Sequence, residues 1–385
     1  MLDISERTKK LGTENAFVVL KEVNELVSKG KSIVNFCIGQ PDFDTPEYIK
    51  QAAIKAIKDG KTGYTPSPGI PELREAVANY LSKTRRIEVK PESIVVSCGA
   101  KPFIGYTILS VTDYGEGEEV LYPNPGFPIY ESMIIASGAK PVPLPLLESK
   151  GYGFDLEYLK NKINKKTRLL ILNSPHNPTG SVLDKKTLKA IADIVQEHDN
   201  LWVFSDEVYS RMVHDGNFES ISSIPGMQER TIIVDGVSKT YAMTGWRIGY
   251  ASNEKLSPHL ARWVTNTDSC AAHPNQYAAL AALTGPQDES QKMMLSFKRR
   301  RDLIVDELNR IEGVKCLKPG GAFYAWPNVT EACKIVGADD SEDLRKRLLY
   351  DAGVAVLSDI HFGHRNKGEG EHISCLLYTS PSPRD

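Results

Sequence analysis

The chain has 385 residues, of which 41% are hydrophobic and 25% charged, and a formal net charge of -2. This length exceeds what one compact core holds and predicts two packed domains in an ordinary soluble protein. The balanced charge gives no electrostatic reason to expect nucleic acid or an acidic membrane as a partner.

Other features of the composition narrow the class of protein. No apolar run approaches the ~20 residues of a membrane span, and the first residues lack the apolar core of a signal peptide. The six cysteines form no CxxC pair and have no histidine at metal-ligand spacing. Such cysteines are typical of small apolar residues in a reducing compartment. We therefore expect a cytoplasmic protein without a metal site.

Short apolar runs alternate with helical patterns over the first two thirds of the chain. The runs are 94–96, 120–122, 169–172, 201–204, 232–234 and 248–251. A helical pattern such as 185–198 has its apolar residues at three-to-four spacing. This alternation predicts an α/β fold, with a mostly parallel sheet that helices cover on both faces. Ligands of such sheets bind at the carboxyl ends of the strands.

The pattern changes after about Pro274. One helix runs to Gly285, a long charged helix follows over 287–311, and shorter strands are expected at 323–326 and 354–357. These features predict a smaller α+β domain. The expected boundaries are an N-terminal segment that joins the small domain, a large domain, a small domain and a tail, at 1–44, 45–275, 276–374 and 375–385.

The segment 236–249, with the sequence GVSKTYAMTGWRIG, is the most informative in the chain. It follows the apolar run 231–234, so a buried strand leads into a loop. A lysine such as Lys239, partly deprotonated by burial, forms a Schiff base with an aldehyde. Ser238 and Arg247 offer hydrogen bonds to phosphate oxygens, and the glycines let backbone amides approach an anion. The alternative is a solvated lysine in an ordinary loop, since short motifs give false positives.

This segment resembles the lysine signature of the class I aminotransferases, which are pyridoxal 5'-phosphate (PLP) enzymes of fold type I. Further motifs follow the order of that family, at 38–43, 63–66, 97–101, 123–128, 173–180 and 206–209. The resemblance runs from Gly39 to about Glu371. It implies a seven-stranded, mostly parallel sheet in the large domain, PLP as cofactor, and amino transfer between an amino acid and a 2-oxo acid.

The resemblance also implies roles for the residues around the cofactor ring. Lys239 holds PLP and moves the proton, and Asp206, 33 residues earlier, pairs with the protonated pyridine nitrogen. Tyr209 donates a hydrogen bond to the ring's phenolic oxygen. The alternative for the last two residues is a strand-end carboxylate and a packing tyrosine.

Three further residues are implied to face the ring and the substrate. Asn177, in a rigid turn made by two prolines and a glycine, reaches the phenolic oxygen and the substrate carboxylate. Gly39 passes its amide beside that carboxylate, and Phe127 stacks on the ring. The alternatives are a turn asparagine that bonds the backbone and a core phenylalanine. His176 is expected to be a structural neighbour.

The phosphate of PLP is expected at a helix start and at a subunit interface. Gly99, Ala100 and Lys101 follow a strand and open a helix, whose free amides make a natural phosphate seat. In the family, the tyrosine at the position of Tyr64 reaches the phosphate of a neighbouring subunit. With the segment 265–269, this implies a homodimer, although a surface-turn tyrosine is the alternative.

The amino donor is less well determined by the sequence. In animal-type aspartate enzymes an arginine of the neighbouring subunit holds the distal carboxylate, and Thr265 stands at that position here. Lys101 offers another cation for this carboxylate, unless it is simply a solvated lysine at a helix start. We favour aspartate and 2-oxoglutarate. Aromatic or small neutral donors, a β-lyase, a decarboxylase and a PLP-binding protein with impaired activity remain open.

The carboxyl end departs from the family pattern. The family ends with a segment close to Tyr-Ile-Arg-(Ile/Leu)-Ser, whose arginine binds the substrate α-carboxylate. Here residues 372–375 contain no arginine, and Arg365 and Arg384 lie outside the register. We interpret residues 375–385 as foreign sequence, a hypothesis that a genuine stop codon after this tail would refute. This departure predicts poor turnover.

Overall fold

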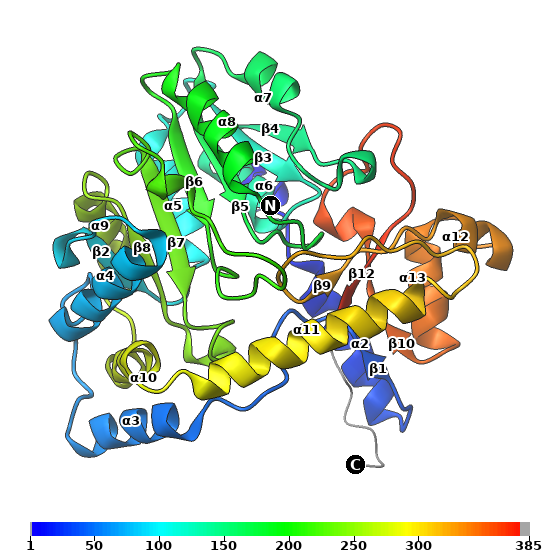
Figure 1. Cartoon of the computed structure of the whole chain (residues 1–385), viewed down its shortest axis with the longest axis horizontal. Coiled ribbons are helices and arrows are strands. Elements are labelled where there is room, and N and C mark those ends of the chain that lie inside the picture. Colours follow the sequence, from blue (N-terminus) through cyan, green and yellow to red (C-terminus); the bar gives the residue numbers. More distant parts are fainter. Residues whose placement is uncertain (1, 378–385) are drawn as a thin grey trace.

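The computed structural model describes residues 2–377. Its larger part is built on a seven-stranded sheet with the strand order β2-β8-β7-β6-β5-β3-β4 (Figure 1). Its neighbouring strands are parallel except that β8 runs antiparallel to both β2 and β7. The predicted mostly parallel α/β sheet is therefore confirmed. The strands are β2 (Ile94–Ser97), β3 (Glu119–Asn124), β4 (Lys140–Pro145), β5 (Thr167–Asn173), β6 (Trp202–Asp206), β7 (Thr231–Gly236) and β8 (Gly249–Ser252).

Helices bury this sheet on both faces, which explains why its strands are almost continuously apolar. Along β5, Leu169 and Ile171 pack into one core cluster with α5 and α6, whereas Leu170 and Leu172 pack into another with α8. Side chains of a strand alternate between faces, so consecutive leucines serve two cores. The helices of this part are α3 (Glu47–Lys58), α4 (Pro71–Arg85), α5 (Pro102–Val111), α6 (Ile129–Ser137), α7 (Leu156–Lys162), α8 (Lys185–Gln196), α9 (Ser257–Thr267) and α10 (His273–Thr284).

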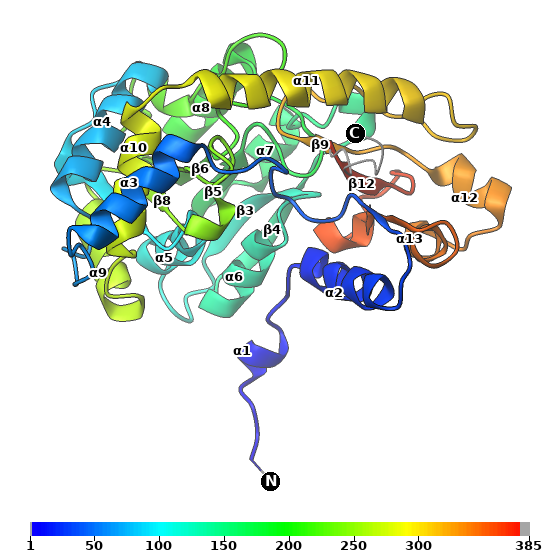
Figure 2. The same ribbon diagram turned by 90° about the horizontal axis from the view of Figure 1, so that it is seen from below.

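A long helix, α11 (Asp288–Leu308), leads from the large sheet to a smaller α+β region (Figures 1 and 2). This region contains an antiparallel sheet of order β11-β12-β9. The expected strand at 354–357 is divided, because β10 and β11 belong to different sheets. Its elements are β9 (Tyr324–Ala325), α12 (Thr330–Val336), α13 (Ser341–Tyr350), β10 (Val354–Ala355), β11 (Leu357–Ser358) and β12 (Ile373–Leu376).

Residues 15–35 pack with the last third of the chain. After α1 (Glu6–Lys9) and α2 (Asn15–Ser28), strand β1 (Val34–Asn35) pairs in parallel with β10. Figure 2 shows α2 beside the small region, on the side opposite α11. This pairing agrees with the expected N-terminal segment, while the domain boundaries themselves stay predictions.

The expected foreign tail is described only in part. Cys375 pairs with Ala325 in the sheet, and residues 375–377 are buried. The rest of the tail, with Arg384, lies outside the described residues. Within 2–377, no helix combines the length and the apolarity that crossing a membrane requires.

Candidate active site

A cavity of about 500 Å³ opens at the carboxyl ends of the parallel strands. Because β5, β6 and β7 end side by side, the loops that follow them meet there, and segments of the small region close the other side. The cavity is lined by most of the predicted site residues: Gly39, Ala100, Lys101, Phe127, Asn177, Asp206, Tyr209, Ser238, Lys239 and Arg247.

Lys239 follows β7 and points its amine into this cavity. Nζ donates a hydrogen bond to the carbonyl of Gly39 and lies 5.4 Å from the ring centroid of Phe323. Burial is the main cause that lowers the pKa of Lys239 to about 8; the carboxylate of Glu14 acts against it, and the cations of Arg247 and Lys101 act with it. Half of the amine is therefore neutral near pH 8, and the neutral form is the one that attacks an aldehyde.

Asp206 ends β6 as a buried carboxyl group. The hydroxyl of Tyr130 donates a hydrogen bond to its Oδ2 at 2.6 Å. Burial raises the pKa of Asp206 to about 6, and the negative charges of Asp235 and Glu207 raise it too, while the bond from Tyr130 lowers it. A carboxylate in these surroundings gains stability from a cationic partner. Tyr130 was not predicted from the sequence, since on α6 it has the helical spacing of an ordinary core residue.

A buried ion-pair network holds the loop behind Asp206. Nε of Arg85 lies 2.8 Å from Oε2 of Glu207, and Nη2 lies 2.6 Å from Oδ2 of Asp235. The hydroxyls of Ser205 and Ser220 also donate to Glu207. Each buried charge therefore has hydrogen-bond partners, as a stable buried network requires. Sequence reasoning missed this network, because its members lie on separate elements.

Tyr209 contacts a residue of the small region. Its hydroxyl lies 2.5 Å from that of Tyr324 on β9. The same hydroxyl of Tyr324 would lie 2.9 Å from a Cβ atom at position 39, so Gly39 leaves it room. Tyr324 lines the cavity too. The sequence offered no signal for it, because no motif surrounds this tyrosine.

Asn177 carries an unsatisfied acceptor. Its backbone amide donates to Oδ1 of Asn173 at 2.8 Å, but its own Oδ1 is buried without a partner among the described residues. Such an atom is costly unless a ligand provides a donor. The ring of His176 bonds Thr179 through Nδ1, its Nε2 is also buried without a partner among the described residues, and burial lowers its pKa to about 3. The neutral ring of His176 fits the expected structural role.

The expected phosphate seat lies between two loops that approach closely. Gly99 has φ +94°, and a Cβ there would lie 2.2 Å from Nη2 of Arg247. A Cβ on Gly249 would lie 2.2 Å from the backbone nitrogen of Ala100. Both positions therefore require glycine. Lys101 is the N-cap residue of α5, and Nη2 of Arg247 donates to the carbonyl of Cys98 at 3.4 Å, so the guanidinium lies beside the loop that leads into this helix.

Comparison with known proteins agrees with this geometry. The family model "Aminotransferase class I and II" matches residues 31–368. The chain belongs to this aminotransferase family. It is 35% identical to the aspartate aminotransferase of Bacillus subtilis over 94% of this chain and 92% of that protein.

Solved structures of this aminotransferase family superpose over almost the whole chain. The aspartate aminotransferase from Rhizobium meliloti gives a TM-score of 0.91 at 32% identity, covering 99% of this chain and 96% of that one. The aromatic aminotransferase from Pyrococcus horikoshii gives a TM-score of 0.84 at 39% identity, with 94% of both chains covered. The fold is thus that of the fold type I aminotransferases, and the cofactor is PLP.

The residues of this aminotransferase fit PLP. The amine of Lys239 suits the aldehyde, and the guanidinium of Arg247 suits the phosphate. The carboxylate of Asp206 suits the ring nitrogen, and the side-chain NH2 group of Asn177 is a donor that suits the phenolic oxygen.

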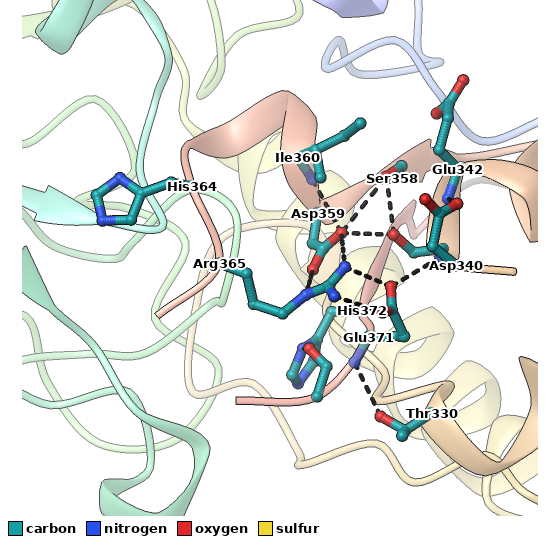
Figure 3. Close-up of polar contacts among 12 residues, drawn as sticks. Thr330, Asp340, Glu342, Ser358, Asp359, Ile360, His364, Arg365, Glu371 and His372 are labelled. Atoms are coloured by element: carbon teal, nitrogen blue, oxygen red, sulfur yellow. Dashed lines mark hydrogen bonds and ion pairs between the residues drawn. The ribbon is translucent and has the colours of Figure 1, made fainter. Parts of the chain in front are cut away.

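Arg365 does not serve the cavity of this aminotransferase. Its Nε donates to Oδ2 of Asp359 at 2.9 Å, and its Nη atoms pair with Glu371 (Figure 3). Among residues 2–377, Arg247 is the one arginine that lines the cavity. Ser374, in the segment where the family has its arginine, lines a small side cavity together with Asn177. The hydroxyl of Ser374 therefore stands where the family pattern has a guanidinium.

Proposed function

We propose that this aminotransferase takes its amino group from aspartate and passes it to 2-oxoglutarate. The observation that carries this choice is the ammonium of Lys101 at the cavity wall, where a second carboxylate of the substrate can reach it. A charge-assisted hydrogen bond of this kind contributes about 1.5–3 kcal/mol, or roughly 10- to 150-fold in discrimination. Relatives that carry the name aspartate aminotransferase support the same substrate.

Lys239 is proposed as the proton carrier of the reaction. With its pKa lowered to about 8, its amine takes the proton from the substrate α-carbon as a base and, as the resulting ammonium, would deliver it to the C4′ carbon of the cofactor in the same half-reaction. Gly39 positions this amine by accepting its hydrogen bond. PLP, when bound, supplies an electron-withdrawing ring that stabilises negative charge at the α-carbon.

Asp206 and Tyr209 are proposed to hold the ring in its reactive state. The bond from Tyr130 fixes the carboxylate of Asp206, which keeps a proton on the ring nitrogen. The hydroxyl of Tyr209, oriented by Tyr324, donates to the phenolic oxygen. Phe127 provides the apolar face, and Asn177 orients the substrate carboxylate.

The phosphate is proposed to be bound by the backbone amides of Ala100 and Lys101, next to Gly99, and by the side chains of Ser238 and Arg247. We also propose a homodimer in the cytoplasm, in which Tyr64 of one subunit completes the phosphate site of the other. Tyr64 is 88% exposed in the single chain, and residues 265–269 are exposed as well. The absence of disulfides among the described cysteines supports a reducing compartment.

Aromatic donors are the second candidate. The rings of Phe17 and Phe127 line the cavity, with their centroids 6.0 and 5.3 Å from Nζ of Lys101, and both favour an apolar side chain. The deciding measurement is kcat/KM for aspartate, alanine and phenylalanine in the parent chain and in Lys101→Ser. We expect a selective loss of at least tenfold for aspartate. An equal loss for all three donors would remove the support for aspartate, and turnover without an oxo acid would indicate a lyase or decarboxylase.

A further inference from the structure

Lys101 already has a carboxylate partner within the chain. Its Nζ lies 2.6 Å from Oε2 of Glu14, and both side chains line the cavity. Two aromatic rings flank the ammonium, with centroids 5.3 Å away for Phe127 and 6.0 Å away for Phe17. The carboxylate of Glu14 therefore takes the position on Lys101 that a second carboxylate of a substrate requires.

The charge of Glu14 reaches the reacting amine. Glu14 raises the pKa of Lys239, against the larger effect of burial, while Lys101 lowers it. The pair of Glu14 and Lys101 therefore belongs to the electrostatic environment of the site and is not an isolated surface ion pair.

Glu14 has a second place for its carboxylate. It is the N-cap residue of α2, yet its side chain accepts no hydrogen bond from the amides of that helix. A helix start attracts negative charge through its free amides and its macrodipole. Its side chain is 24% exposed, which leaves room for a change of rotamer. When another carboxylate occupies Lys101, Glu14 can therefore turn back to the start of its own helix.

We propose that Glu14 determines substrate selectivity by competing with the distal carboxylate of dicarboxylic substrates for Lys101. The proposal rests on the proposed amino transfer and concerns the same site. A neutral donor leaves the ion pair in place and packs against Phe17 and Phe127. A dicarboxylate displaces Glu14. One cavity thereby accepts both neutral and acidic substrates, and Glu14 sets the ratio of the kcat/KM values for the two kinds of substrate.

The test uses the PLP-loaded chain and its variant Glu14→Gln, which removes the charge and keeps the size. Succinate and propionate serve as probes, and calorimetry measures their dissociation constants. We expect succinate to bind roughly threefold to tenfold more tightly in the variant, and propionate to be unchanged, because the competing charge is gone and Lys101 is partly exposed. The ratio of kcat/KM for aspartate over phenylalanine rises by the same factor.

Two further variants make the result specific. Glu25→Gln changes the same net charge on the same helix, at a side chain that is 60% exposed, and we expect no effect on either probe. When Glu14→Gln is added to Lys101→Ser, we expect no gain in the affinity for succinate. Unchanged succinate binding, an equal gain for both probes, or a gain that persists without Lys101 would overturn the proposal. Failure of amino transfer itself is seen separately, as absence of oxo-acid-dependent turnover.

Discussion

Asp206 and Lys101 line the same cavity in very different surroundings. Asp206 is 8% exposed and ends a central strand, with a buried ion-pair network behind it. The side chain of Lys101 is 43% exposed, and its partner Glu14 comes from a segment 87 residues away. The cofactor half of the site is thus fixed by the sheet, whereas the substrate half depends on side chains that can exchange partners. In our proposal, this difference lets the chemistry stay constant while the substrate range varies.

The largest effect is expected in the cofactor half. Lys239→Ala removes the amine that attaches PLP, so covalent binding is lost completely while the fold is kept. Absorbance of the bound cofactor and mass spectrometry after borohydride reduction measure this loss, with circular dichroism as the control for folding. A reducible bond that survives in the variant would show that another lysine is the attachment site.

A smaller effect is expected in the substrate half. Ser374→Arg places a guanidinium at the side cavity that Ser374 shares with Asn177, so the α-carboxylate gains a charge-assisted partner. We expect kcat/KM to rise roughly 10- to 150-fold for every donor. Steady-state kinetics with aspartate and phenylalanine measure it, and Ser374→Met controls for the added volume. A gain limited to one donor would contradict a role at the shared carboxylate.

The smallest expected effect is on the pH dependence of PLP capture. It couples Lys239 in the cofactor half of the site to Glu14 in the substrate half. The neutral form of Lys239 captures PLP, and its pKa is lowered to about 8. Below this pH the rate of capture by the cofactor-free chain rises about tenfold per pH unit, and above it the rate levels off. Glu14 raises this pKa, so Glu14→Gln moves the plateau to lower pH. Stopped-flow absorbance follows the capture. A plateau at the same pH in the parent chain and in Glu14→Gln would show that Glu14 does not affect the pKa of Lys239.

Much of the fold was predictable because its signals are local. The apolar runs of β5 and β6 and the helical spacing of α8 follow from burial on both faces of a parallel sheet. The motifs around Lys239 and Asn177 also lie next to strand ends, so their places in the cavity follow from the topology. Short strands such as β10 and β11 were predicted less well, since two residues carry too little pattern.

The sequence by itself determined the family, the cofactor and the residues that follow strand ends, because each of these depends on neighbours in the chain. Only the tertiary structure decided three contacts: Tyr130 bonds Asp206, Tyr324 bonds Tyr209, and the carboxylate of Glu14 pairs with the ammonium of Lys101. These contacts join residues that are 76, 115 and 87 positions apart. Nothing in the local pattern of a tyrosine or a glutamate marks such a partner, since the packing of separate elements brings the two side chains together.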